Sequence, residues 1–161
     1  MATTILKFNQ RTILKISDYS FDGDTFKPRY LIILYKDSDI IVYATVSKSQ
    51  LFPPKYETAD RKLKDLKGEY WCFKFTSGEV VGNKDFCFPE TSYVNVHHSP
   101  GVFETTLEEL LKKYPDTISE KAILDKKIFG ELLYCVYKSS FLKRKIKKLL
   151  QPTLERIFGP L

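Results

Sequence analysis

The first hundred residues alternate short apolar runs with short polar pieces. The runs are rich in Val, Ile, Tyr and Phe, as is typical of strands, and read "TILKI", "YLIILY", "IIVYATVS", "EYWCFKF", "FCF" and "YVNVHH". The pieces between them favour turns, for example "FDGDTFKP", "KDSD", "TSGEVVGNKD" and "FPETS". This spacing predicts a small, strongly bent antiparallel sheet or barrel over residues 1–100.

After "SPGVF" the period of the pattern becomes helical. The segment "ETTLEELLKKYP" places threonines three positions ahead of glutamates, as in a capping box, and a helix there would end at Pro115. A second helix is predicted from about Gly130 to Leu150, stopped by Pro152. The piece "SEKAILDKKIF" between them fits either a helix or a strand. The predicted fold class is therefore α+β and mainly β, as one domain of residues 1–161 with a barrel core and a helical extension over 103–158.

Composition supports one globular domain, because 43% of the 161 residues are hydrophobic. Lys7 and Arg11 interrupt the apolar residues at the start, which is the pattern of neither a signal peptide nor a transit peptide. The sequence has no apolar run near the ~18 residues that a membrane span needs. We therefore expect a soluble, cytoplasmic protein that does not enter a membrane.

The net charge of +6 comes from one end of the chain. Residues 1–137 carry nineteen basic and nineteen acidic residues, whereas residues 138–161 carry seven basic residues and one acidic. Apolar residues recur there at helical spacing, so the segment is predicted to be an amphipathic helix with a basic back. The apolar stripe is Leu142, Ile146, Leu149 and Leu150, and the basic residues are Lys143, Arg144, Lys145, Lys147 and Lys148. A solvated face, a nucleic-acid contact and a membrane-surface contact all stay open.

The sequence lacks the motifs of several common kinds of catalytic and nucleotide-binding site. The sequence has no phosphate-binding glycine loop, dinucleotide fingerprint, zinc-protease motif or hydrolase elbow. Cys72, Cys87 and Cys135 are odd in number and widely spaced, so we interpret them as core thiols. His97 and His98 are adjacent, and neighbours on a strand point to opposite faces. They are therefore predicted to have surface or hydrogen-bonding roles, not to act together on one substrate.

Arg29 stands at the mouth of the most apolar run, "YLIIL". A buried strand would fix its backbone, and its forked donors suit a carboxylate or a phosphate. One interpretation is an ion pair with Asp22 or Asp24. The other is a binding site, and Ser47, at the end of the next apolar run, is either part of that site or an ordinary strand-end residue.

The order of these motifs resembles the MazF/PemK-like toxins. In that family a polar loop leads to a basic residue, an arginine and an apolar strand, and a second strand ends in a small hydroxyl residue. In this chain, "FDGDTFKPRYLIIL" resembles the first part of that pattern and "DIIVYATVSKSQ" resembles the second. The segment "CFPETSYVNVHH" resembles the family's serine, apolar strand and polar pair. The segment "LDKKIFGELLYCVYKSSFLKRKIKKLL" resembles its closing helix.

The resemblance implies a small SH3-like antiparallel β-barrel with appended helices, usually as a homodimer. It implies cleavage of single-stranded RNA without a metal or other cofactor, and an antitoxin protein partner that covers the RNA groove. The family's arginine falls on Arg29 and its threonine on Ser47, which keeps the hydroxyl. The sequence departs from the pattern in that Pro28 precedes the arginine and Tyr30 follows it, and in that the usual Gly-Asp opener is missing.

Neighbouring residues complete the predicted site. Lys27 and Lys48 flank the pair and are expected to hold the RNA backbone. Tyr30, Phe26 or Tyr43 would stack unpaired bases. The alternative is a module of the same barrel that binds RNA or a protein partner and has no catalytic activity.

Overall fold

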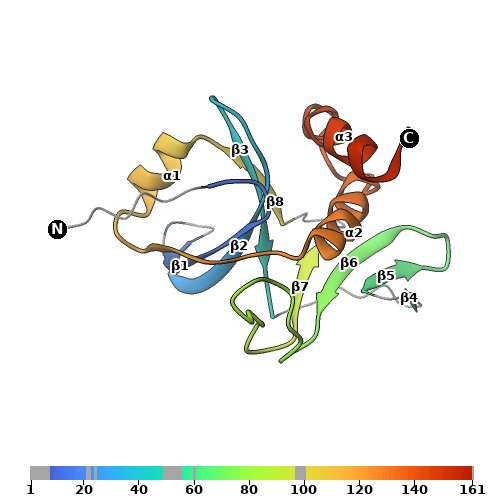
Figure 1. The fold of residues 1–161 in the computed structure, drawn as a ribbon, viewed down its shortest axis with the longest axis horizontal. Helices are drawn as coiled ribbons and strands as arrows, with labels where there is room; N and C mark the ends of the chain where they lie inside the picture. Colours follow the sequence, from blue (N-terminus) through green and yellow to red (C-terminus); the bar gives the residue numbers. More distant parts are fainter. Residues whose placement is uncertain are drawn as a thin grey trace.

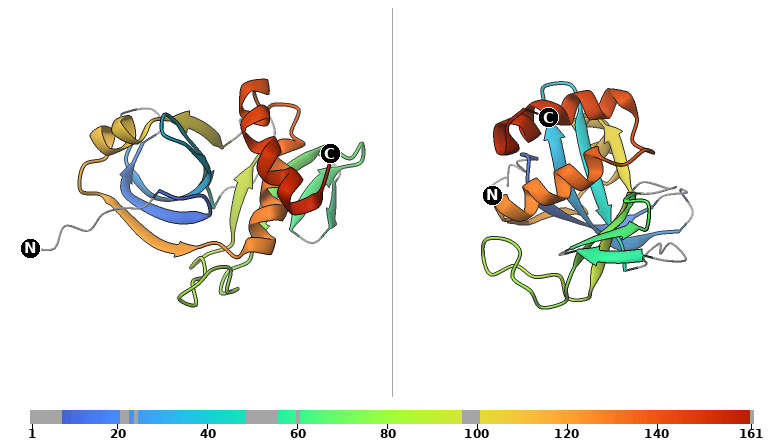
Figure 2. Two further views of the ribbon diagram at one scale, coloured as in Figure 1. Left: turned by 45° about the horizontal axis from the view of Figure 1, so that its top comes forward. Right: turned by 90° about the vertical axis from the view of Figure 1, so that its right-hand side faces the viewer.

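A computed structural model describes residues 8–20, 23, 25–48, 56–59, 61–96 and 101–160, with only the backbone described for 56–59. Its larger sheet is antiparallel, with strand order β8-β3-β2-β1-β9, and curls strongly (Figures 1 and 2). The first three strands follow one another along the chain, and the two edge strands come from later in it. The strands are β1 (Thr12–Tyr19), β2 (Lys27–Lys36), β3 (Ile41–Val46), β8 (Val102–Thr105) and β9 (Ile118–Ile123).

A smaller antiparallel sheet lies beside the first, with strand order β4-β5-β6-β7. Its strands are β4 (Tyr56–Ala59), β5 (Lys62–Asp65), β6 (Tyr70–Phe75) and β7 (Ser92–Asn95). The two sheets meet where Ser47, just after β3, bridges to Tyr93 of β7. The Ser47 N–H donates to the Tyr93 carbonyl at 2.8 Å, and the Tyr93 N–H donates to the Ser47 carbonyl at 2.7 Å.

Three helices complete the described fold: α1 (Leu107–Lys113), α2 (Lys126–Tyr137) and α3 (Arg144–Phe158). Helix α1 joins the two edge strands of the larger sheet, and α2 and α3 pack together beside the smaller one (Figure 2). No helix in the described part of the chain is long and apolar enough to cross a bilayer.

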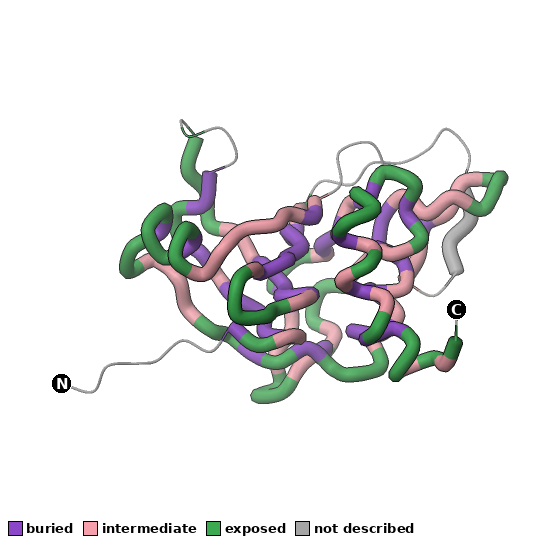
Figure 3. Tube along the Cα trace, turned by 90° about the horizontal axis from the view of Figure 1, so that it is seen from above, coloured by how far each residue is buried: buried purple, intermediate pink, exposed green. Residues whose placement is uncertain are grey.

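The larger sheet is buried on both faces, which explains the uninterrupted apolar run of β2. Leu31 and Ile33 point into one cluster, together with Leu110 of α1. Ile32 and Leu34 point into the main core, which the smaller sheet, α2 and α3 complete. Figure 3 marks the buried, intermediate and exposed residues along the chain trace. Because successive side chains alternate between faces, only a strand covered on both sides is apolar at every position.

Helices α1 and α2 begin at side-chain caps. The Thr106 hydroxyl accepts from the backbone N–H of Glu109 at 3.0 Å, so the predicted capping threonine and the helix end before Pro115 are confirmed. The Asp125 carboxylate caps α2 by accepting from the N–H groups of Lys127 and Ile128. Such caps satisfy backbone donors that the first turn of a helix leaves unpaired.

Helix α3 is tied to the rest of the fold through the turn before it and through its apolar stripe. The buried Ser139 hydroxyl donates to the carbonyl of Val96, the residue directly after β7, and accepts from the Phe141 N–H at 3.2 Å. Ile146 and Leu150 are buried in the main core, so the predicted amphipathic character of this segment is confirmed. Its basic residues face outward or lie at the flank of the helix.

The coarse prediction of a mainly β, α+β fold with C-terminal helices is confirmed. The closed SH3-like barrel is not confirmed, because the described strands form two sheets that meet without closing. The single helix predicted over 130–150 is wrong, since α2 ends at Tyr137 and α3 begins at Arg144. Pro152 does not stop α3, because it lies on the exposed side of the helix while Thr153 and Leu154 continue the buried side.

Some strands also differ from the prediction. The run "FCF" at 86–88 is irregular, although Phe88 is buried. The ambiguous piece between the helices forms β9 and the start of α2, and both β8 and β9 belong to the larger sheet. A boundary near residue 100 therefore does not separate strands from helices. All three cysteines are free thiols, of which Cys72 and Cys135 are buried.

Candidate functional site

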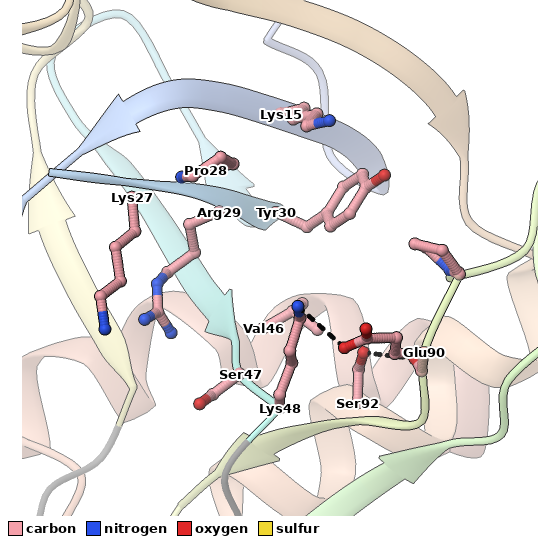
Figure 4. A pocket seen from close by; sticks show the side chains of 11 residues that line it. Lys15, Lys27, Pro28, Arg29, Tyr30, Val46, Ser47, Lys48, Glu90 and Ser92 are labelled. Atoms are coloured by element: carbon pink, nitrogen blue, oxygen red, sulfur yellow. Dashed lines mark hydrogen bonds and ion pairs between the residues drawn. The ribbon is translucent and has the colours of Figure 1, made fainter.

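A pocket of about 440 Å³ opens where the two sheets meet. The start of β2 forms one wall, the end of β3 forms the floor, and the loop before β7 forms the other wall (Figure 4). Five of the six residues predicted for the site line it. These are Lys27, Arg29, Tyr30, Ser47 and Lys48.

Strand register brings Arg29 and Ser47 together. Tyr30 pairs with Val46 in the antiparallel β2–β3 ladder, so one step further Arg29 comes opposite Ser47. Side chains directly opposite each other share a face of the sheet. Figure 4 shows the Arg29 guanidinium and the Ser47 hydroxyl on the same side, with Lys27 beside them. The bridge to Tyr93 fixes the Ser47 backbone at this place.

Arg29 is half-buried beside a group of tyrosines. Burial lowers the pKa of the Arg29 guanidinium, and the nearby Tyr19 hydroxyl raises it. Tyr19 lies 3.2 Å from Tyr43, oxygen to oxygen, and burial is the main cause that raises the pKa of both phenols. Both therefore stay neutral at ordinary pH. Since a guanidinium keeps its proton even when burial lowers its pKa, the pocket wall carries a fixed positive charge in a partly desolvated place, where its attraction for an anion is stronger than in water.

The lysines make the pocket basic. Lys48 pairs with Glu90 at 2.8 Å, but both side chains are largely exposed, and such surface pairs contribute at most about 1 kcal/mol. Lys27 is exposed at the rim. Together with Lys15 and Arg29, these lysines give four basic side chains against one carboxylate among the described lining residues. The combination of a guanidinium, ammonium groups and a hydroxyl suits an oxyanion such as a phosphate.

The aromatic residues divide between the pocket, the surface and the core. The Tyr30 ring is held edge to face by Phe86 and Phe88, with centroids 5.8 and 5.2 Å away. Phe26 is 58% exposed and does not line the pocket. Tyr43 is only 7% exposed, so the prediction that it could stack a base is wrong.

Sequence reasoning missed the three remaining polar residues of the described lining, Lys15, Glu90 and Ser92. The Lys15 ammonium lies 5.7 Å from the centre of the Tyr30 ring, which is its cross-strand partner. The Ser92 hydroxyl donates to the Glu90 carbonyl at 2.7 Å. Lys15 reaches the pocket through the pairing of consecutive strands, whereas Glu90 and Ser92 reach it through the packing of distant segments, which no local pattern signals.

Some predictions fall outside the described residues. These are the roles of His97 and His98, and the pairing of Arg29 with Asp22 or Asp24. Among the described residues, no three His, Cys, Asp or Glu side chains gather as metal ligands would. No protein-family model, curated protein or solved structure matches the chain.

Proposed function

We propose that the protein is a metal-independent endoribonuclease that cleaves single-stranded RNA in this pocket, as the toxin of a toxin–antitoxin pair. The observation that carries the proposal is the meeting of Arg29 and Ser47 in a basic pocket. Both residues were selected from their order in the sequence, on the resemblance to MazF/PemK-like toxins. In this proposal the curled five-stranded sheet is a divergent form of the SH3-like barrel. The antitoxin would cover the pocket, and two copies of the chain would pair as in that family.

The reaction would use the 2′-OH of the RNA as nucleophile. Its oxygen bonds to phosphorus as the bond from phosphorus to the 5′ oxygen breaks, which leaves a 2′,3′-cyclic phosphate and a 5′-OH. The 2′-OH loses a proton and the leaving oxygen gains one. Arg29 would donate to the non-bridging oxygens, where its hydrogen bonds strengthen as negative charge develops.

The remaining pocket residues would position the substrate. Ser47 would hydrogen-bond the same phosphate or orient the 2′-OH. Lys27 and Lys48 would hold neighbouring phosphates, and Lys48 could exchange its exposed partner Glu90 for one of them. The exposed part of Tyr30 would contact a base, and Phe26 would stack a base outside the pocket.

A second candidate function is RNA binding without cleavage, or binding of a protein partner. It is favoured by the ion pair between Glu90 and Lys48, because Glu90 is the one carboxylate among the described lining residues. The described lining also contains no histidine, so the proton acceptor for the 2′-OH is not apparent among these residues. A pocket that only binds RNA needs no such group.

Incubation of the purified protein with a long single-stranded RNA in EDTA tests the proposal. We expect discrete fragments that end in 2′,3′-cyclic phosphate, lost in Arg29→Ala and in Ser47→Ala. Ser140→Ala and Arg156→Ala make the same changes at exposed positions away from the pocket and should cleave as wild type does. Urea unfolding of each variant checks that it is folded.

Binding to RNA with 2′-O-methyl groups, which cannot attack the phosphate, separates the two functions. Intact RNA from folded protein, together with tight binding of the methylated RNA that Arg29→Ala weakens, would favour the second candidate. Intact RNA without binding would refute RNA as the substrate and as the ligand.

A further inference from the structure

Helix α3 presents basic residues along its outer side. Ile146, Leu150 and Leu154 fix the inner side of the helix in the core. Lys145 lies outside and pairs with Glu104 of β8 at 2.8 Å. We define the basic face of α3 as the remaining cations of its first two turns, Arg144, Lys147 and Lys148.

The first turn of α3, where the basic face begins, differs in charge from the first turn of α1. In α1 the first turn is acidic, with Glu108 and Glu109, and the last turn holds Lys112 and Lys113. This order suits the helix dipole, which is positive at the N-terminus. Within the described structure, the first turn of α3 has neither an acidic residue nor a side-chain cap, and it is basic instead.

This arrangement costs stability. Arg144 stands three and four positions before Lys147 and Lys148, where like charges on a helix repel each other. The positive end of the dipole repels the same side chains. A face that only needed to be solvated could carry mixed charges, as α1 does. The chain instead places on this face three of the seven cations of residues 138–161, the segment that holds the whole excess of +6, and this concentration indicates an anionic partner.

We propose that the basic face of α3 binds the phosphate backbone of a nucleic acid. A repeating polyanion fits three cations spaced along a rigid helix. A membrane surface fits less well, because a helix lying in a bilayer inserts its apolar side, and here that side is buried in the core. None of the described residues that line the pocket comes from α3, so this contact is separate from the pocket and does not depend on cleavage.

Salt dependence gives the expected size of the effect. For single strands, each neutralised phosphate contributes about 0.7 to the slope of log affinity against log salt, so three contacts contribute about 2. We take the three contacts to contribute nothing at 1 M salt. A variant without them should then bind about 50-fold more weakly than wild type at 0.15 M salt.

The test measures binding of a 30-nucleotide 2′-O-methyl single strand by wild type and by the triple variant Arg144→Gln, Lys147→Gln, Lys148→Gln. We expect the triple variant to bind about 50-fold more weakly at 0.15 M salt, with a slope lower by about 2 and little difference at 1 M. Its unfolding midpoint in urea should equal or exceed that of wild type, because the substitutions remove repulsion.

A matched control removes the same charge from exposed lysines elsewhere. It is Lys67→Gln, Lys112→Gln, Lys121→Gln. Equal weakening by the two triple variants would overturn the proposal, since net charge alone would then explain binding. Wild-type binding to phosphatidylserine vesicles that the α3 variant loses, with its RNA binding unchanged, would also overturn it. A protein that cleaves no RNA but shows the α3 effect would refute the nuclease and support this contact.

Discussion

Ser139 allows the packing of α3 to be tested by a single hydroxyl. It lies in the turn between α2 and α3 with 1% of its surface exposed. Its oxygen donates to the Val96 carbonyl and accepts from the Phe141 N–H. Ser139→Ala removes both bonds while keeping almost the same volume. The change therefore measures the polar connection between this turn and the end of β7.

The expected cost follows from these two bonds. A buried backbone group left without its partner costs about 1–3 kcal/mol, and a typical hydrogen bond contributes about 1 kcal/mol net. We expect Ser139→Ala to lower the free energy of unfolding by about 2–3 kcal/mol. In urea, with a slope of about 2 kcal/mol per molar, the midpoint would fall by about 1 M.

Ser140→Ala provides the control, because it is the same substitution at the next residue. Ser140 is exposed, and its hydroxyl donates to the Glu69 carboxylate at 2.8 Å. Ser140→Ala should cost less than about 1 kcal/mol, as exposed polar contacts do. Equal costs at the two positions, or a cost below about 0.5 kcal/mol for Ser139→Ala, would refute the reasoning.

Two further predictions concern the core. Leu150→Ala truncates a fully buried side chain of α3 and should lower the free energy of unfolding, measured in urea, by about 2–5 kcal/mol. Leu111→Ala, where the side chain is 42% exposed, should cost much less, and similar costs would contradict the packing. Burial raises the pKa of the Cys135 thiol from 9.0 to about 12. The folded state thus favours the neutral thiol, and this contribution is complete below pH 9 and lost as pH rises from 9 toward 12. The urea midpoint should therefore fall more steeply above pH 9 for wild type than for Cys135→Ala, and identical slopes would contradict the burial of the thiol.

The sequence predicted the elements whose pattern is local. Strands β2 and β3 were found because their apolar runs are buried on both faces, and α1 was found through its capping threonine. The hairpin of β4 and β5 was missed, because "YETA" and "KLKD" are polar and lack a clear alternation. Pro152 misled the prediction of α3, since a proline on the exposed side of a helix is tolerated when burial of the other side continues through Leu154.

The pocket could be predicted only in part, for a related reason. Arg29 lies on β2 and Ser47 directly follows β3, so their meeting follows from the register of this hairpin. Ser92 begins β7 of the other sheet and Glu90 lies in the loop before it, and the bridge between Ser47 and Tyr93 brings both to the pocket. That bridge joins residues that are far apart in the chain, and no periodic pattern in the sequence predicts it.

The same bridge has a consequence for how the protein folds. Strands β1, β2 and β3 are joined by short connections, so their pairing closes only small loops and is expected early. The contact of Ser47 with Tyr93 closes a far longer loop and must wait until β6 and β7 have formed. The pocket is thus assembled late, and a chain emerging from the ribosome would have no complete pocket until well after its first sheet strands had paired.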